Sequence, residues 1–154
     1  MIKTLDTSTI RMLHADEVDK ALPLALAFHE ESDIVEQSDI EEHWGGVWAT
    51  TIENGSGGII AYEVEGEVVG VMCFLVGTSP LDGILQMTEA MWYVLKPHRG
   101  QGMVLLEVTE MLAHELGCKR LFMAHLASIK ADRLGKIFKR RGFTPVETYY
   151  MKDI

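Results

Sequence analysis

The spacing of apolar residues changes along the chain and predicts alternating strands and helices. Residues 7–13 alternate polar and apolar positions, which is typical of a strand, and apolar residues at helical spacing follow up to about residue 29. An acidic stretch, residues 30–42, leads into a second expected helix over about residues 39–52. The glycine-rich residues 54–58 cannot continue that helix and predict a turn.

The middle of the chain is rich in β-branched and aromatic residues and predicts three antiparallel strands in series. Two β-rich runs, residues 59–65 and 67–76, are separated by Gly66 alone, so a hairpin is the economical interpretation. A loop then leads to a third expected strand over residues 84–95. We therefore expect the three strands to form a meander.

Helical spacing returns in the last third of the chain. Residues 102–116 place their apolar residues on one side of a helix, and Gly117 is positioned to end it. Residues 120–126 predict a buried strand, parallel to the strand before the helix because a helix-length crossover separates them. A last helix over about residues 131–141 and one or two terminal strands over residues 143–152 complete the expected order.

Length and composition place these elements in one domain. The chain has 154 residues and is 47% hydrophobic, which suits one sizeable core, so residues 1–154 are expected to form a single domain. No apolar run is long enough to span a bilayer and the N-terminus does not resemble a signal peptide, so we expect a cytoplasmic protein without membrane contact. The only cysteines, Cys73 and Cys118, have no metal-binding spacing, and neither a metal nor a disulfide framework is expected.

The net charge of -9 is unevenly distributed along the sequence. Residues 1–67 hold 15 acidic and 3 basic residues, whereas residues 68–154 hold 8 acidic and 11 basic residues. An acidic chain offers little basic surface to displace phosphate counterions, so no nucleic-acid partner is expected. The asymmetry suits a C-terminal half that receives a phosphorylated cofactor and an N-terminal half that attracts a cation, although solvated helix faces would explain the same charges.

Residues 94–106 are the most informative segment of the chain. They read as a strand end, a glycine-rich turn and the start of an amphipathic helix. The glycines let the backbone approach a ligand closely, and the free amides and dipole at a helix start favour an anion. We therefore expect a phosphate-bearing cofactor, although an ordinary strand-to-helix connection has the same pattern. The spacing matches neither the dinucleotide motif GxGxxG nor the Walker motif GxxxxGK[ST].

This segment resembles the central motif of the GNAT acetyltransferase family, Arg/Gln-x-x-Gly-x-Gly/Ala. Arg99 and Gly102 match the motif, and Val104 stands where the family prefers glycine or alanine. The segment that ends in Gly142 and Phe143 resembles the family's apolar-Tyr-x-x-x-Gly-Phe ending, with Phe138 in the tyrosine position. The predicted order of elements is also the family's order over nearly all of the chain.

The resemblance implies both a fold and an activity. The fold would be the α/β GNAT, or acyl-CoA N-acyltransferase, fold, with a mixed and mostly antiparallel sheet of about six to seven strands and about four flanking helices. The activity would be an N-acetyltransferase that moves an acetyl or short acyl group from acetyl-CoA to a primary amine by direct attack. The alternative is a catalytically idle module that binds CoA or a protein partner.

The acceptor that the resemblance implies is an amine on a small molecule or a protein. The acidic N-terminal helices and the stretch after residue 30 are expected to form one wall of the acceptor site, which favours cationic acceptors. The sequence is compatible with a homodimer and does not choose an acceptor.

The resemblance also assigns acetyl-CoA binding to the glycine-rich turn. Backbone amides of the turn would bind the pyrophosphate, and the backbone at Val94 would hold the thioester carbonyl and the pantetheine arm where the two parallel strands splay apart. The expected cofactor-binding residues are Val94, Arg99, Gly100, Gln101, Gly102, Met103 and Val104.

The catalytic residues follow from the same resemblance. Glu89 is the only acid within residues 84–95, where family members often carry a general base, although a solvated or paired glutamate would fit there too. Phe138 cannot donate a proton, so Tyr149 and Tyr150 are the candidate general acids, with packing of a terminal strand as the alternative. A water molecule could also supply this proton.

Overall fold

The described part of the protein forms two compact units. The computed structural model describes residues 3–5, 8–32, 35–125 and 131–154. The N-terminal unit spans residues 1–124 and the C-terminal unit spans residues 125–154. The expectation of a single domain stays a prediction.

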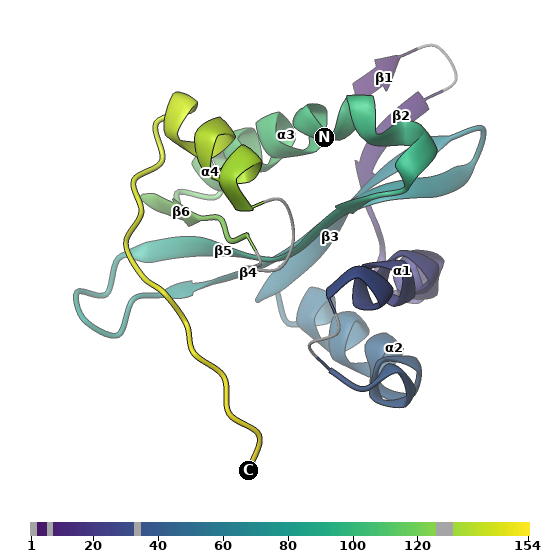
Figure 1. Ribbon diagram of the computed structural model, residues 1–154, viewed down its shortest axis with the longest axis horizontal. Helices are drawn as coiled ribbons and strands as arrows, with labels where there is room; N and C mark the ends of the chain where they lie inside the picture. The colour runs from purple at the N-terminus through teal and green to yellow at the C-terminus, as the bar shows by residue number, and fades with distance from the viewer. Residues whose placement is uncertain (1–2, 6–7, 33–34, 126–130) are drawn as a thin grey trace. The chain divides into compact units, whose positions relative to one another are not determined.

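The N-terminal unit is built on a six-stranded sheet (Figure 1). Its strands are β1 (Lys3–Leu5), β2 (Ser8–Met12), β3 (Gly57–Val64), β4 (Glu67–Thr78), β5 (Leu85–Val94) and β6 (Arg120–Phe122). They lie across the sheet in chain order, and every neighbouring pair is antiparallel except β5 and β6, which are parallel. The sheet is therefore mixed and mostly antiparallel, as predicted.

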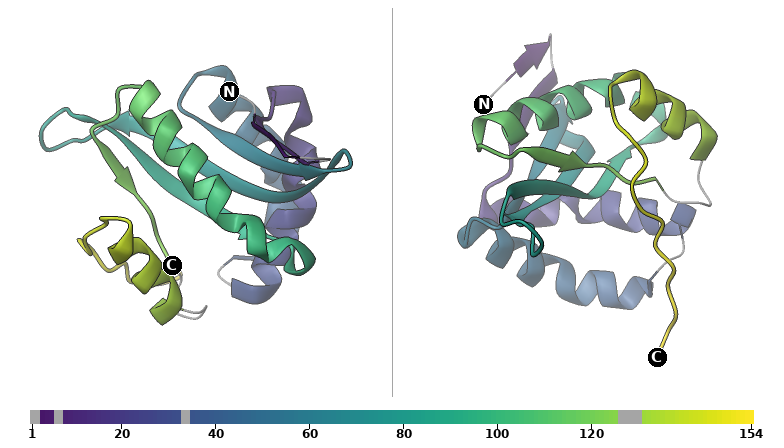
Figure 2. Two further views of the ribbon diagram at one scale, coloured as in Figure 1. Left: turned by 90° about the horizontal axis from the view of Figure 1, so that it is seen from above. Right: turned by 90° about the vertical axis from the view of Figure 1, so that its left-hand side faces the viewer.

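Helices cover both faces of this sheet. The 3-10 helix η1 (Ala15–Ala21) continues into α1 (Leu22–Ser32), which with α2 (Gln37–Glu53) covers one face. The other face is covered by α3 (Gly102–Glu115), which runs along the sheet in the left view of Figure 2. None of the described helices combines the length and apolar character that crossing a bilayer would require.

The central strands are apolar because both of their faces are buried. Residues 68–74 of β4 are all buried, and they alternate between the two core clusters. Val71 and Cys73 pack on the side of α1 and α2, whereas Met72 and Phe74 pack on the side of α3. Burial on both faces explains the near-continuous apolar run in the sequence.

The predicted meander of β3, β4 and β5 is confirmed. Its first turn needs the glycine from which the hairpin was predicted. Glu65 and Gly66 have φ angles of 51° and 82° between β3 and β4. Two-residue hairpin loops with positive φ at both positions match the twist of the flanking strands, and glycine adopts this conformation without strain. Gly117 ends α3 with a φ of 80°, also as predicted.

The C-terminal unit contains α4 (Ala131–Arg140), and Gly142, two residues after its end, has a φ of 89°. The Phe138 ring lies 5.5 Å from the Phe143 ring and 6.5 Å from the imidazole of His125. The remaining residues, 144–154, have no regular structure and are exposed.

Three expectations about the elements differ from the structure. β1 was not predicted, and β6 ends at Phe122 instead of continuing towards residue 126, which lies outside the described residues. The prediction of terminal strands over residues 143–152 is wrong, because these described residues form no strand. The sheet therefore has six strands and does not reach the upper end of the expected six to seven. Pro145 has no N–H to donate to a sheet, and the side chains around it are exposed.

Candidate functional site

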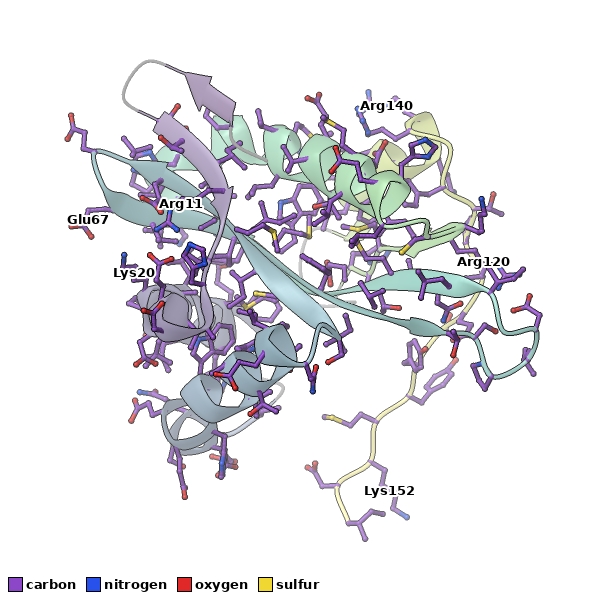
Figure 3. All side chains as sticks on the ribbon, turned by 180° about the vertical axis from the view of Figure 1, so that it is seen from behind. Arg11, Lys20, Glu67, Arg120, Arg140 and Lys152 are labelled. Carbon is purple, nitrogen blue, oxygen red and sulfur yellow. The ribbon has the colours of Figure 1, made fainter. Side chains whose placement is uncertain are left out.

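The parallel strands β5 and β6, which lie at one edge of the sheet, separate after a short pairing. Their pairing covers three residue pairs and ends at Thr88 and Phe122. Beyond this point β5 continues to Val94, and in the described part of the chain only β4 pairs with it. The ion pair between Arg120, labelled in Figure 3, and Asp82 lies at the closed end of this opening. The edge of β5 from residue 89 to residue 94 is thus open to a ligand.

A β-bulge lies on β5 directly after the strands separate. Glu89 pairs with Phe74 and Met91 pairs with Cys73, so Ala90 is an extra residue relative to β4. Bulges disrupt the ladder locally, bend the strand and redirect side chains, and they are common next to active sites. Glu89 therefore occupies the point where β5 leaves β6 and bends.

Burial gives the Glu89 carboxyl an unusual protonation equilibrium. The side chain keeps some accessible surface, yet protein atoms surround it densely enough that burial raises its pKa to about 8. Desolvation disfavours the charged form of a carboxyl, and no hydrogen bond or charge from a described residue offsets it. A base whose pKa lies near the working pH both accepts and releases protons readily, so Glu89 is suited to general base catalysis.

Neither cysteine of the N-terminal unit is suited to act as a nucleophile. Cys73 is fully buried, and burial together with the nearby Glu89 carboxyl raises the pKa of its thiol. Burial also raises the pKa of Cys118. The thiolate is the nucleophilic form, so raised pKa values keep both sulfurs inert.

The predicted glycine-rich turn joins the end of β5 to α3. Its residues form a 3-10 helix, η2 (Lys96–Gln101), which continues directly into α3 at Gly102. The Gly102 N–H donates a hydrogen bond to the Arg99 carbonyl. The segment is thus a tight helical turn, and a helix N-terminus follows at the open end of β5.

The two glycines of this turn leave space that the fold itself does not need. No atom lies within 4 Å of a Cβ placed on Gly100. A Cβ on Gly102 would lie 3.5 Å from Val94 Cγ2 and 3.9 Å from Trp92 Cζ2, which is ordinary van der Waals contact, and its φ of -60° suits any residue. Close approach of an anionic group to the helix start would explain both glycines, and the turn thus fits a pyrophosphate.

The side chain of Arg99 is fixed by three contacts. Its Nε donates to the Val94 carbonyl at 2.9 Å, and its Nη2 donates to both Glu31 carboxylate oxygens at 3.0 Å. The guanidinium also lies 5.3 Å from the centre of the Tyr93 ring. Sequence reasoning missed the roles of Glu31 and Tyr93, because Glu31 lies 68 positions from Arg99 and no local pattern connects them.

The other predicted cofactor-binding residues lie at the same turn. Gln101 is exposed, and Met103 is half-buried in the first turn of α3. The Val104 side chain packs against the core on the α3 side of the sheet, so the branched residue at the family's glycine position points towards the protein interior. Val94 lies at the far end of the open edge, because the strands separate earlier, after Thr88.

The two candidate acids belong to the C-terminal unit. Tyr149 and Tyr150 are 88% and 93% exposed, and the Glu147 carboxylate raises the pKa of Tyr149 through a hydrogen bond and its charge. Their role in catalysis stays a prediction.

A group of three exposed side chains on α2 was not recognised in the sequence. Asp39, Glu42 and His43 place one ligand atom each within 4.8 Å of one another, which follows from their helical spacing. Exposed acidic groups of this kind are common without an ion, and we assign no role to them.

Comparisons with solved structures show the fold. A ribosomal-protein-alanine N-acetyltransferase from Brucella melitensis biovar Abortus has a TM-score of 0.72 at 17% identity, over 96% of this chain and 99% of its own. An aminoglycoside acetyltransferase from an uncultured soil metagenomic sample has a TM-score of 0.74 at 18% identity, over 96% of this chain and 98% of its own. A GCN5-related N-acetyltransferase from Ralstonia eutropha has a TM-score of 0.73 at 19% identity, over 96% and 98% of the two chains.

The sequence comparisons point the same way. No curated protein matches the sequence significantly. The profile of the acetyltransferase (GNAT) family matches residues 18–143, which is more than half of the chain and includes Glu89, the glycine-rich turn and α3. Structural neighbours, element order and family match agree, and the chain therefore belongs to the acetyltransferase (GNAT) family.

Proposed function

We propose that this chain moves an acetyl or short acyl group from acetyl-CoA to a primary amine. The observation that carries the proposal is the arrangement along β5. A carboxyl with a pKa of about 8 lies where the strand becomes open, and a helix start cleared by glycines follows at the end of the same strand. A base thus lies at one end of the unpaired edge of β5, and a candidate phosphate site lies at its other end.

The binding of acetyl-CoA would use the open edge and the turn together. When bound, acetyl-CoA supplies a thioester that is activated towards amines. Backbone amides at Met103 and Val104 would hold its pyrophosphate, because the first turn of a helix carries unpaired amides and a positive dipole end, whereas the Gly102 N–H already donates to the Arg99 carbonyl. Peptide groups of β5 from residue 89 onward, other than the Val94 carbonyl that accepts from Arg99, would bind the extended pantetheine arm in the way an added strand binds.

Glu89 would act as the general base for direct attack. It accepts a proton from the substrate ammonium, and the free amine then attacks the thioester carbonyl carbon. The new C–N bond forms as the C–S bond breaks, and the nitrogen releases its second proton to water. The sulfur leaves as a thiolate that takes up a proton from water or from Tyr149 or Tyr150. Protons and electrons balance without a metal or a redox partner.

Cationic amines are the proposed acceptors. Acidic side chains crowd the end of α1 and the start of α2, where Glu30, Glu36, Asp39, Glu41 and Glu42 are exposed. Carboxylates concentrate cations by their field, and acceptor amines are cations at neutral pH. The structural neighbours include an aminoglycoside acetyltransferase and a ribosomal-protein-alanine N-acetyltransferase, so small-molecule and protein acceptors both fit the proposal.

Acetyl-CoA is expected to raise the melting temperature of the protein. A ligand that binds only the native state stabilises it by about 2.7 kcal/mol at a hundredfold excess over Kd. For a chain of this size that corresponds to about 5 to 10 °C, which thermal unfolding followed by circular dichroism resolves easily. Acetate at the same concentration serves as the control. An unchanged melting temperature at millimolar acetyl-CoA would contradict the cofactor assignment.

A catalytically idle CoA-binding module is the second candidate, and Phe138 at the family's tyrosine position favours it. The two candidates agree on the rise in melting temperature and differ in turnover. An idle module would bind acetyl-CoA and release no thiol with any amine, whereas the proposed enzyme releases CoA only when an amine is present.

A further inference from the structure

The end of α1 reaches the end of β5 through two side chains three positions apart. The Phe28 ring contacts the Tyr93 ring edge to face, with centroids 6.0 Å apart, and Glu31 binds Arg99. Residues three apart on a helix lie on the same face, so one face of α1 delivers both contacts. These four side chains form one continuous cluster, Phe28–Tyr93–Arg99–Glu31, which we call the α1 clamp.

The ion pair of the α1 clamp is partly buried. The side chains of Arg99 and Glu31 are only 33% and 27% exposed, and Arg99 reaches both carboxylate oxygens. Partly buried, charge-assisted contacts to arginine hold geometry better than exposed pairs, whose median contribution is about 0 to 1 kcal/mol. Burial and the Glu31 charge raise the pKa of Tyr93, so its hydroxyl stays protonated beside Glu31.

Arg99 connects both ends of the turn that precedes α3. Its side chain binds the carbonyl of Val94, the last residue of β5, and its main-chain carbonyl accepts the N–H of Gly102, the first residue of α3. The placement of the helix start relative to β5 therefore depends on where Arg99 is held. The same contacts leave its guanidinium neutralised by Glu31, so Arg99 is not a free cation for a phosphate.

We propose that Glu31 is a positioning residue for acetyl-CoA binding, which it promotes by holding Arg99 and thereby the start of α3. This inference rests on the proposed function, because it assumes that the turn binds acetyl-CoA. Without the Glu31 charge, Arg99 loses its carboxylate partner in the described structure and the turn populates other arrangements. The apparent Kd then rises in inverse proportion to the fraction of molecules that keep the competent turn.

Calorimetric titration with acetyl-CoA tests this role. Glu31→Gln is expected to weaken binding by about tenfold, the scale of one charge-assisted hydrogen bond. Glu53→Gln is the matched control, because Glu53 is an exposed glutamate at the end of α2, which covers the same face of the sheet as α1, and it is expected to bind like the parent. In turnover assays the KM for acetyl-CoA should rise in Glu31→Gln while kcat stays close to the parent value, a split that a general loss of folded protein would not produce.

A double-mutant cycle tests whether Glu31 acts through Arg99. In an Arg99→Gln background, Glu31→Gln is expected to cause no further loss of affinity, because the partner is already absent. Should Glu31→Gln fail to fold, Arg99→Lys keeps the charge but loses the planar fork and is expected to weaken binding about tenfold. If Glu31→Gln binds acetyl-CoA as tightly as the parent, the positioning role is overturned and the proposed function is not. The same holds for Arg99→Lys where that variant is tested instead. A parent protein that does not bind acetyl-CoA would overturn the proposed function and this inference together.

Discussion

Replacing Glu89 with glutamine is expected to lower kcat by about 10²-fold or more, the usual scale for loss of a general base. The amide keeps the shape of the side chain but accepts no proton at neutral pH. Acetyl-CoA affinity should change little, because the glycine-rich turn lies at the other end of the open edge. Steady-state kinetics with a reactive amine and titration with acetyl-CoA measure the two effects separately.

The pH dependence should identify Glu89 as the group responsible. Its carboxylate is the active base, and with a pKa of about 8 only about a tenth of the molecules carry it at pH 7. The parent kcat/KM should therefore rise with pH and level off above about pH 8. Glu89→Gln should lose the part of this rise that levels off near pH 8 and keep only the rise that follows the free amine, so its deficit relative to the parent should shrink at high pH.

Protein stability gives an independent readout of the same pKa. Because the pKa of Glu89 is raised in the folded state, the native protein holds its proton more tightly than the unfolded chain. The parent should lose stability as pH rises from the ordinary carboxyl range through about 8, and Glu89→Gln should lose less over that window. Glu67→Gln, at an exposed position that begins β4, is the control. Equal rates for Glu89→Gln and the parent from about pH 6 to 9 would move the base role to a water molecule or to Tyr149 or Tyr150.

Gly102→Val is expected to weaken acetyl-CoA binding by about 10²-fold, corresponding to the loss of two charge-assisted hydrogen bonds. The Cβ itself fits beside Val94 and Trp92, but the branches of valine project at the start of α3, where the pyrophosphate would approach the amides. Gly102→Ala should show a smaller loss, because it adds only the methyl group that the neighbours accommodate. Calorimetric titration gives the affinities.

The same series needs a control for effects on the fold. Gly77→Ala adds a side chain to β4 at a position where no atom lies within 4 Å, and it should leave both affinity and melting temperature unchanged. The melting temperature of ligand-free Gly102→Ala should also stay close to that of the parent. A folded Gly102→Val that binds acetyl-CoA as tightly as the parent would show that the turn is not the phosphate site.

Local patterns were sufficient to predict the elements whose signals are local. The hairpin between β3 and β4 follows from Gly66, and the end of α3 follows from Gly117, because both positions need positive φ. β1 has only three residues and exists through pairing with β2, as in Lys3 opposite Ile10, so no pattern of its own predicts it. The terminal strands were expected as the completion of the element order, but a strand also needs a strand partner, and residues 143–152 have none in the described structure.

The candidate site could also be proposed from the sequence only where its signals are local. Glu89 and the turn could be proposed from the sequence, because the family resemblance points to an acid on this strand, Glu89 is the only one within residues 84–95, and the turn carries a contiguous motif. Their roles stay predictions. The bulge at Ala90 depends on the register between β4 and β5, and the raised pKa depends on burial, so neither follows from neighbouring residues. The contact between Glu31 and Arg99 joins positions far apart in the chain and required the folded structure.

Transfer of a labelled acetyl group tests the proposed activity most directly. The protein is incubated with acetyl-CoA that carries 13C in the acetyl group and with a panel of polyamines, aminoglycosides and peptides with free N-termini or lysines. Mass spectrometry then follows the label. The account predicts that the label moves to an amine in an amount equal to the CoA thiol released, only when the protein is present. Acetyl-CoA that binds while its label stays in the thioester with every amine would contradict it.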